Sequence, residues 1–226
     1  MAEQDWAKMP GSLDPADVSV GQTDNVAFQI PEGVHCVGFH SLNAVVGFTG
    51  YVLNLSGFNP ISGHKGGIIK GYMRKHVVGT GGAAVFFFVT STNAQGAEGY
   101  MLGISEDNPA QLILRKGMLN QGLSISSPGV LRVSQASYPN PTWLYPILYM
   151  TVNTQGDVAL RVRQSVLSIE VAIPGMDDIV DDVLGKASGS PPVFGDFYPG
   201  FGHYNSGQSG RLSLFDALMA SRQLTP

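Results

Sequence analysis

Charged side chains are scarce in this sequence. They make up 13% of its 226 residues, whereas an ordinary soluble domain carries roughly 25%. Charged residues normally keep a protein surface hydrated and interrupt its apolar patches. Because hydrophobic residues reach 43%, we expect part of the surface to be covered by other subunits, which indicates a homo-oligomer.

Cysteine, long apolar runs and a basic excess are also missing. Cys36 is the only cysteine, which excludes an intrachain disulfide and a zinc site built from thiolates. No stretch approaches the ~20 apolar residues of a membrane helix, and residues 1–21 hold no apolar core of a secretory signal. The net charge of −4 lacks the basic excess of proteins that bind nucleic acid or anionic membranes. We therefore expect a protein made in a cytoplasm, with neither nucleic acid nor membrane as a partner.

What is present is a series of short apolar runs separated by glycine and proline, a pattern typical of many strands joined by turns. The sequence predicts one all-β domain over residues 26–226, an antiparallel β-sandwich with room for one short helix. The predicted strands are 34–39, 44–55, 67–78, 83–91, 99–105, 111–117, 129–135, 142–153, 157–164, 167–173, 199–205 and 211–223.

Local patterns refine these strands. Asp107, Asn108 and Pro109 favour a chain reversal, so residues 99–117 are predicted to form a hairpin. The run "AVFFFV" does not alternate between apolar and polar residues and is expected to be buried on both faces. Pro146 cannot donate to a sheet ladder, so we expect an irregularity there.

Residues 1–25 are predicted to be an extended N-terminal arm. They are polar, are broken by Pro10 and Pro15, and show neither the helical nor the strand period. Trp6 is the one large apolar anchor in this segment. It either docks on the body or on a neighbouring subunit, or belongs to a frayed chain end.

Four aspartates, Asp177, Asp178, Asp181 and Asp182, stand close together in "IPGMDDIVDDVLG". In a helix starting near Asp177 they share one side, and the apolar residues fill the other. We interpret the stretch as the solvated face of a short helix. A calcium site at these four residues is the alternative, although the spacing of a calcium-binding loop is absent. Catalysis is the third interpretation, and carboxylates of one charge do not define an acid and a base.

No catalytic residues are predicted elsewhere. The chain has five glutamates and no E-x-D-x-E or E-x-D-x-x-E strand, which disfavours sugar hydrolysis. The nucleophile elbow, phosphate loop and zinc-protease helix motifs are absent, and the histidines are scattered. We expect a protein that is not an enzyme and that has no cofactor, calcium being the exception to test.

One local basic cluster contains Lys65, Lys70, Arg74 and Lys75. Together with Trp6, these residues are candidate assembly contacts that could hold an acidic partner. The other interpretation is that such charges protect the wet side or the edge of a strand.

The segment "PGFGHYNSGQSGRLSLFDALMASRQ" (199–223) resembles the closing strands of concanavalin A-like, or laminin-G-like, sandwiches. "AAVFFFVTS" and "TWLYPILYMTVNTQGDVALRVRQ" resemble middle strands of that family. With "IPGMDDIVDDVLGKASGSPP" inserted, residues 65–223 are similar to laminin-G-like structural proteins of tailed bacteriophages. The resemblance implies a jelly roll of two curved antiparallel sheets. It does not imply a ligand, although many relatives bind sugars through a calcium-organised loop.

Two functions follow from these features. The first is a non-enzymatic structural component of a tailed-phage virion, in the neck or tail, made in the host cytoplasm and working through self-association and contacts with other virion proteins. The alternative is a carbohydrate-binding, lectin-like module for receptor recognition. Its candidate sugar-stacking residues are Tyr198, Phe201 and Tyr204, with Trp143 more typical of a core residue.

Overall fold

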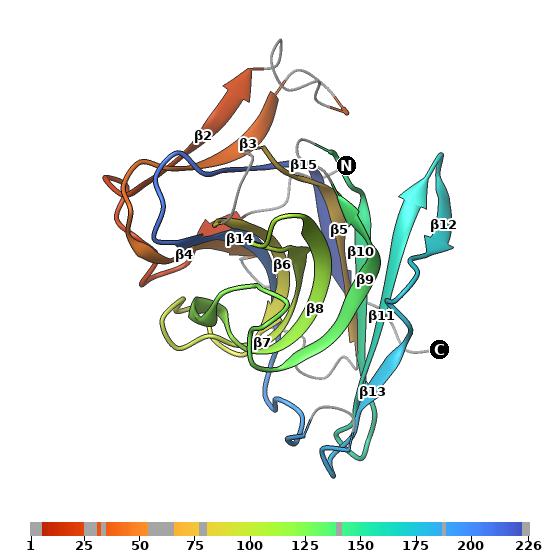
Figure 1. Ribbon diagram of the computed structural model, residues 1–226. Helices are drawn as coiled ribbons and strands as arrows, with labels where there is room; N and C mark the ends of the chain where they lie inside the picture. The colour runs from red at the N-terminus through yellow and green to blue at the C-terminus, as the bar shows by residue number, and fades with distance from the viewer. Residues whose placement is uncertain are drawn as a thin grey trace.

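Two antiparallel β-sheets face each other in this chain (Figure 1). The computed structural model describes residues 6–24, 31–32, 35–53, 66–76, 81–138, 142–186 and 189–222. These residues contain strands β1 to β15 and a single turn of 3₁₀ helix, η1 (Leu119–Gln121). The predicted all-β antiparallel sandwich is confirmed. In the described part of the chain, no helix has the length and apolar character needed to cross a membrane.

The first sheet has seven strands, which follow one another across the sheet in an order different from that of the chain. The order is β1 (Trp6–Lys8), β4 (Val46–Leu53), β14 (Tyr198–Ser206), β6 (Ala83–Val89), β7 (Glu98–Ile104), β8 (Ala110–Met118) and β9 (Val130–Tyr138).

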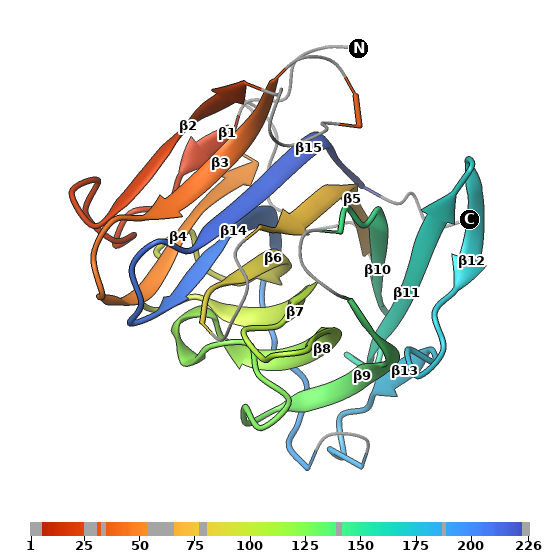
Figure 2. The same ribbon diagram turned by 45° about the horizontal axis from the view of Figure 1, so that its top comes forward.

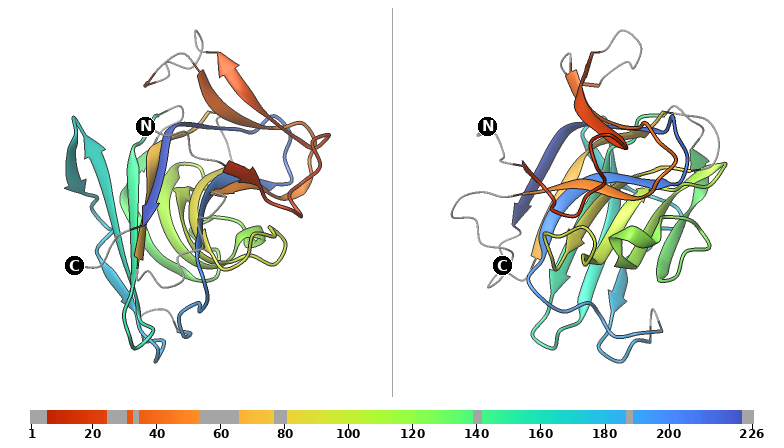
Figure 3. Two further views of the ribbon diagram at one scale, coloured as in Figure 1. Left: turned by 180° about the vertical axis from the view of Figure 1, so that it is seen from behind. Right: turned by 90° about the vertical axis from the view of Figure 1, so that its left-hand side faces the viewer.

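The second sheet has eight strands. Seven lie in the order β12 (Ile169–Ala172), β11 (Val158–Val166), β10 (Pro146–Val152), β5 (Gly66–Lys75), β15 (Leu212–Arg222), β3 (His35–Ser41) and β2 (Val18–Asp24). The eighth, β13 (Ile179–Asp181), pairs with β11 beyond the end of β12. Figures 2 and 3 show β12 and β13 at one margin of the molecule.

Each predicted strand overlaps an observed one, and the predicted hairpin 99–117 corresponds to the β7–β8 pair. The prediction that "AVFFFV" is buried on both faces is also confirmed. Phe86 and Phe88 belong to the core between the sheets, whereas Phe87 packs in a second apolar cluster. Leu119 and Leu123 also belong to that second cluster, which keeps this side of β6 dry.

Residues 6–24 contain two strands joined by turns, and each strand adds to one of the sheets, which the sequence did not predict. β1 pairs with β4, and β2 pairs with β3. A three-residue strand is too short to show a period, which explains why β1 was missed. Trp6 docks on the body, where its ring meets Phe201 edge-on at 5.0 Å between centroids. The division of the chain at residue 25 stays a prediction.

The helix predicted from Asp177 is wrong, because this segment forms β13. Ile179, Val180 and Asp181 are 5%, 52% and 0% exposed, which is the alternation of a strand. β13 pairs with β11. The buried side chain of Asp181 forms an ion pair with Lys116 at 2.9 Å. These contacts come from residues distant in the chain and outweigh the local helical signal.

The irregularity expected at Pro146 is confirmed. β10 starts at this proline, and just before it the backbone forms an isolated bridge to β5, between Leu144 and Met73. Tyr145 lies between the bridge residue Leu144 and the first residue of β10, and its ring contacts Tyr72 of β5.

Candidate functional site

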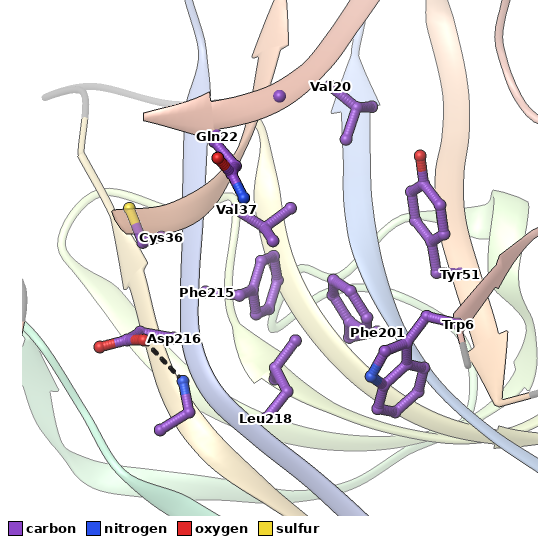
Figure 4. Close-up of a pocket in the computed structure, with 12 residues that line it drawn as sticks. Trp6, Val20, Gln22, Cys36, Val37, Tyr51, Phe201, Phe215, Asp216 and Leu218 are labelled. Atoms are coloured by element: carbon purple, nitrogen blue, oxygen red, sulfur yellow. Dashed lines mark hydrogen bonds between the residues drawn. The ribbon is translucent and has the colours of Figure 1, made fainter. Parts of the chain in front are cut away.

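A pocket of about 460 Å³ opens between the two sheets, and we call it the mouth pocket. Strands β1, β4 and β14 supply Trp6, Tyr51 and Phe201, and β15 supplies Phe215 from the opposite sheet. Figure 4 shows these four rings around one space. The lining residues are Trp6, Val20, Gly21, Gln22, Cys36, Val37, Tyr51, Phe201, Phe215, Asp216, Ala217 and Leu218.

Among the described residues, one charged group borders the mouth pocket, and it is hydrogen-bonded to the backbone. Asp216 accepts hydrogen bonds from the backbone N–H of Ala217 (2.7 Å) and of Glu32 (2.9 Å). Figure 4 shows its carboxylate turned away from the rings. The pKa of Asp216 is raised by burial, and burial together with this carboxylate raises the pKa of the neighbouring Cys36 thiol to about 11. The mouth pocket is therefore chiefly apolar, with an unreactive thiol at its margin.

The outer face of the eight-stranded sheet carries two adjoining hollows of about 400 and 440 Å³, which share Glu170. We call them together the outer trench. The first hollow is lined by Glu32, Lys70, Tyr72, Tyr145, Ile147, Ser165, Leu167, Ser168 and Glu170. The second is lined by Tyr149, Thr151, Ala159, Leu160, Arg161, Glu170, Asp178, Ile179 and Val180.

Two tyrosines line the first hollow of the outer trench. The rings of Tyr72 and Tyr145 meet edge-to-face at 4.6 Å and 85°, and Trp143 meets Tyr72 in the same way at 6.4 Å. Burial is the main cause that raises the pKa of Tyr72 and of Tyr145, and Glu32 adds to it. The hollow thus offers ring surface together with protonated phenols.

Polar groups surround these rings. The Tyr149 hydroxyl donates a hydrogen bond to Glu170 Oε1 at 2.6 Å, and burial and this contact raise the pKa of Tyr149 to about 12. Lys70 lines the same hollow as Glu32 and Glu170, and within the described residues its ammonium group has no ion pair. Hydrogen-bond donors and acceptors therefore stand on both sides of the trench.

The second hollow contains an ion-paired cluster. Asp178 receives Arg161 Nε at 2.9 Å and Arg163 Nη1 at 2.8 Å. Hydrogen bonds from both arginines lower the pKa of the Asp178 carboxyl, although its partial burial opposes them. The cluster fixes the segment before β13 beside β11. The Arg161 side chain remains largely exposed to solvent.

Strand alternation places the trench residues on one face. Lys70 and Tyr72 alternate along β5 with Met73 and Ile69 on the buried face, and Tyr145, Ile147 and Tyr149 are likewise spaced by two. This spacing is visible in "IIKGYMRK" and "LYPILYM", and it could have identified the site. The aromatics predicted to stack on sugars lie instead within 198–204.

The predicted sugar-stacking residues do not form one surface. Tyr204 and Tyr198 pack with the second apolar cluster on one side of β14, whereas Phe201 belongs to the core between the sheets. Their spacing along an extended strand explains the separation, because residues an odd number of positions apart point to opposite faces. Phe201 is the one that reaches a pocket, the mouth pocket. Trp143 is half-buried, with Arg74 stacked over its ring at 5.6 Å.

The four predicted calcium ligands are not brought together. Asp181 is bound by Lys116 and Tyr100, Asp178 is bound by two arginines, and Asp182 accepts the backbone N–H of Leu184. Asp177 is exposed. Among the residues that the structure describes, no group of three or more His, Cys, Asp or Glu side chains is placed to hold a metal ion. Calcium binding stays a prediction.

The predicted basic cluster is divided by burial. Arg74 and Lys75 are 4% and 3% exposed, so they are neither the wet side of an edge strand nor surface contacts. Lys75 donates to the backbone oxygen of Ser105 at 2.9 Å, and burial lowers its pKa to about 8. β5 is a central strand, which explains the burial. Lys70 is partly exposed in the trench, and Lys65 lies outside the described residues.

A histidine flanked by two serines lies inside the sandwich. His203 Nε2 is 2.8 Å from Ser41 Oγ, and its Nδ1 is 2.8 Å from Ser213 Oγ. All three side chains are fully buried, and burial lowers the pKa of His203 to about 3. The hydroxyls have no access to a substrate, so this arrangement holds the two sheets together through β14, β3 and β15.

Comparison with known proteins supports the fold. No family model and no curated protein matches the chain. Among solved structures, a PL-14 alginate lyase from Aplysia kurodai is similar over 91% of this chain and 87% of its own, with 12% identity and a TM-score of 0.57. The cellulose-induced protein Cip1 covers 97% and 92%, with 14% identity and a TM-score of 0.54.

A third similar structure is an engineered GH43 glycoside hydrolase. It matches 99% of this chain and 41% of its own, with 11% identity and a TM-score of 0.52. At these identities the likeness defines a β-sandwich fold and nothing finer. None of these three is named as a virion protein, so the relation to tailed-phage proteins stays a prediction.

Proposed function

We propose that this chain is a carbohydrate-binding β-sandwich and that the outer trench holds the glycan. The observation that carries the proposal is the edge-to-face pair of Tyr72 and Tyr145, flanked by Lys70 and Glu170. The apolar C–H face of a sugar packs on an aromatic ring, and its hydroxyls take the hydrogen bonds of nearby charged groups. A hollow of about 400 Å³ lies within the size range of small-ligand sites.

Charge in the trench favours a neutral glycan. The two hollows are lined by three carboxylates, those of Glu32, Glu170 and Asp178, and by two cations, those of Lys70 and Arg161. Arg161 is already paired with Asp178. In the first hollow Glu32 and Glu170 outnumber Lys70, so an anionic polymer such as alginate would meet a net negative charge there, and like charges brought together cost free energy. Neutral oligosaccharides avoid this repulsion.

The proposal is one of binding without cleavage. Tyr149 keeps its proton at neutral pH because its pKa is raised to about 12, so it acts as a hydrogen-bond donor to Glu170 and not as a base. Two of the similar structures are named as a lyase and a glycoside hydrolase, and this supports polysaccharides as the ligand class. It does not transfer their activity.

The test is calorimetric titration with cellohexaose, xylohexaose and an alginate oligosaccharide. We expect a neutral oligosaccharide to bind and alginate to bind at least about 10-fold more weakly. Tyr145→Ala should lower the affinity by about 10-fold, through the loss of one stacking surface. Tyr198→Ala, a half-buried tyrosine on the other sheet, is the matched control and should bind as the parent does.

Addition of a chelator separates this site from the calcium alternative. Because the trench needs no metal, affinity should be unchanged by EDTA; loss of binding would instead support a site organised by calcium. If no neutral oligosaccharide binds, or if Tyr145→Ala binds as tightly as the parent, the trench is not the glycan site.

A second function, self-association as a structural protein, is favoured by one observation. Eight exposed apolar side chains lie on β11, β12 and β13, on the turn between β11 and β12, and on the segments that follow β13, and we call them the apolar margin. They are Val166, Leu167, Ile169, Val171, Val180, Val183, Leu184 and Phe194. β12 and β13 both pair with β11, so they lie along the same side of the sheet. An exposed apolar strand edge is a surface for another chain.

The partner that fits this margin is a second copy of the chain. Two such edges can pair antiparallel about a twofold axis, with the same residues on both sides. The low charge content of the chain agrees with a covered surface. In its specific form, this second proposal is that the chain is a structural protein in the neck or tail of a phage particle, where it contacts other virion proteins.

A further inference from the structure

The mouth pocket is a second cavity of ligand size, and it differs in chemistry from the outer trench. Its volume of about 460 Å³ lies in the range of small-molecule sites. Whereas charged groups surround the trench, the mouth pocket is lined by four aromatic rings, three of them from the seven-stranded sheet, and by aliphatic side chains of the eight-stranded sheet. Its ligand must therefore be more apolar than a sugar.

The aromatic rings form a set of mutually oriented surfaces. Trp6 meets Phe201 edge-on at 88°, Tyr51 lies nearly parallel to Phe201 at 5.8 Å and 16°, and Phe215 is tilted against Phe201 at 5.2 Å. Phe201 is thus the centre of the cluster, and Trp6 and Tyr51 are its partly exposed members. The pocket therefore presents both ring faces and ring edges, and a flat aromatic ligand can stack on the faces and pack against the edges.

Apart from Asp216, the polar side chains at the pocket are neutral. Within the described residues, no hydrogen bond is formed by the Trp6 indole N–H, the Tyr51 hydroxyl or the Gln22 amide. Burial raises the pKa of Tyr51, so its hydroxyl stays protonated. Asp216 is held by backbone N–H groups and turned away, yet its charge near the pocket disfavours an anion. The available groups are mainly donors, and they select a ligand with an oxygen acceptor.

We propose that the mouth pocket binds a small neutral phenol or aryl ether. Its aromatic ring packs against Trp6 and Tyr51, the partly exposed rings of the cluster, and its oxygen accepts a hydrogen bond from Tyr51 or Gln22. Packing supplies the affinity, whereas the donors fix the orientation. This site is independent of the glycan proposal, because it shares no lining residue with the outer trench.

The chain provides its own reporter for this site. Trp6 and Trp143 are its two tryptophans, so Trp143→Phe leaves Trp6 as the single fluorophore in the pocket wall. Titration of this variant with 4-phenylphenol should give a saturable change in Trp6 emission with one-to-one stoichiometry. The converse variant, Trp6→Phe, keeps an aromatic ring for folding and leaves Trp143 as the fluorophore, which should not respond.

Two comparisons decide the proposal. Tyr51→Phe or Gln22→Leu should weaken 4-phenylphenol binding by about 5-fold, as expected for one lost hydrogen bond. The saturated analogue 4-cyclohexylcyclohexanol should bind at least about 5-fold more weakly, because it lacks the ring faces.

Equal affinity for the saturated analogue, or a linear response without saturation, would overturn the assignment. Tyr145→Ala should leave phenol binding unchanged, so failure of the glycan proposal and failure of this one are distinguishable. Circular dichroism and thermal unfolding of each variant confirm that a lost signal is not a lost fold.

Discussion

At the scale of single residues, the buried charges are the most consequential. Lys116 and Asp181 form an ion pair at 2.9 Å with side-chain exposures of 6% and 0%. Tyr100 donates to the same carboxylate at 2.7 Å, and Lys116 also donates to the backbone oxygens of Ser190 and Pro191. This network joins β7 and β8 of one sheet to β13 of the other, so it closes one end of the sandwich.

Removal of one partner should therefore be costly. Lys116→Met leaves the Asp181 carboxylate buried without a cation, and we expect the free energy of unfolding to fall by about 3–5 kcal/mol. The double variant Lys116→Met/Asp181→Leu should recover most of this loss. Urea unfolding followed by circular dichroism measures both. Lys186→Met, at an exposed lysine, is the control and should change stability by under about 0.5 kcal/mol. A similarly small effect of Lys116→Met would show that the ion pair does not contribute to the free energy of unfolding.

His203 predicts a dependence of stability on pH. Its pKa is lowered by burial to about 3 in the folded chain, against about 6.5 when unfolded. Between these values the unfolded state binds a proton that the folded state does not, so the stabilisation is complete above pH 6.5 and is lost as pH falls towards 3. We expect the parent to lose up to about 5 kcal/mol relative to His203→Gln over this range. Unfolding curves of both proteins at several pH values measure it. Parallel pH profiles would contradict this role.

At the scale of elements, the hairpin of β11 and β12 has an unusual turn. Val166 pairs with Ile169, and the two residues between them, Leu167 and Ser168, have φ angles of 50° and 65°. Side chains rarely adopt this left-handed region, and Asn-Gly is the usual sequence for such a two-residue turn. Leu167 is also 93% exposed, so nothing in the described chain compensates for its conformation by packing.

A change to the favoured turn sequence should stabilise the hairpin. Leu167→Asn with Ser168→Gly is expected to raise the free energy of unfolding by about 0.5–1 kcal/mol, because both residues then accept positive φ. Chemical denaturation measures the gain, and the single variant Leu167→Gln, which removes the apolar side chain but keeps the strain, should not show it. Loss of stability in the double variant would mean that Leu167 contributes a contact.

The strands also show what sequence patterns can and cannot predict. β6, β7, β8 and β14 were predicted because apolar runs between turn residues are a local signal. β13 was predicted as a helix from the local i, i+4 spacing of its residues, whereas the strand is held in place by Lys116, which is 65 positions away in the chain. The trench depends on the same kind of non-local contact, since Tyr72 and Tyr145 meet only when β5 and the start of β10 are paired.

At the scale of the whole molecule, the scarcity of charge and the apolar margin lead to one expectation. We expect sedimentation velocity at increasing concentration to show a dimer or larger species. Ile169→Glu combined with Val180→Lys should weaken association by at least about 10-fold, because a charge buried in an apolar interface is costly. Leu42→Lys is a matched control, an exposed leucine remote from β12 in the strand order. A monomer at every concentration would exclude this interface.

The tip of the β11–β12 hairpin belongs to two surfaces at once. Leu167 borders the outer trench and is also part of the apolar margin. Copies that associate through the margin would therefore hold their trenches near one another. Such an array gains from avidity, because a polymer already held at one trench reaches the next at high effective concentration. Weak recognition of a single sugar segment would then suffice for lasting attachment to a repetitive surface.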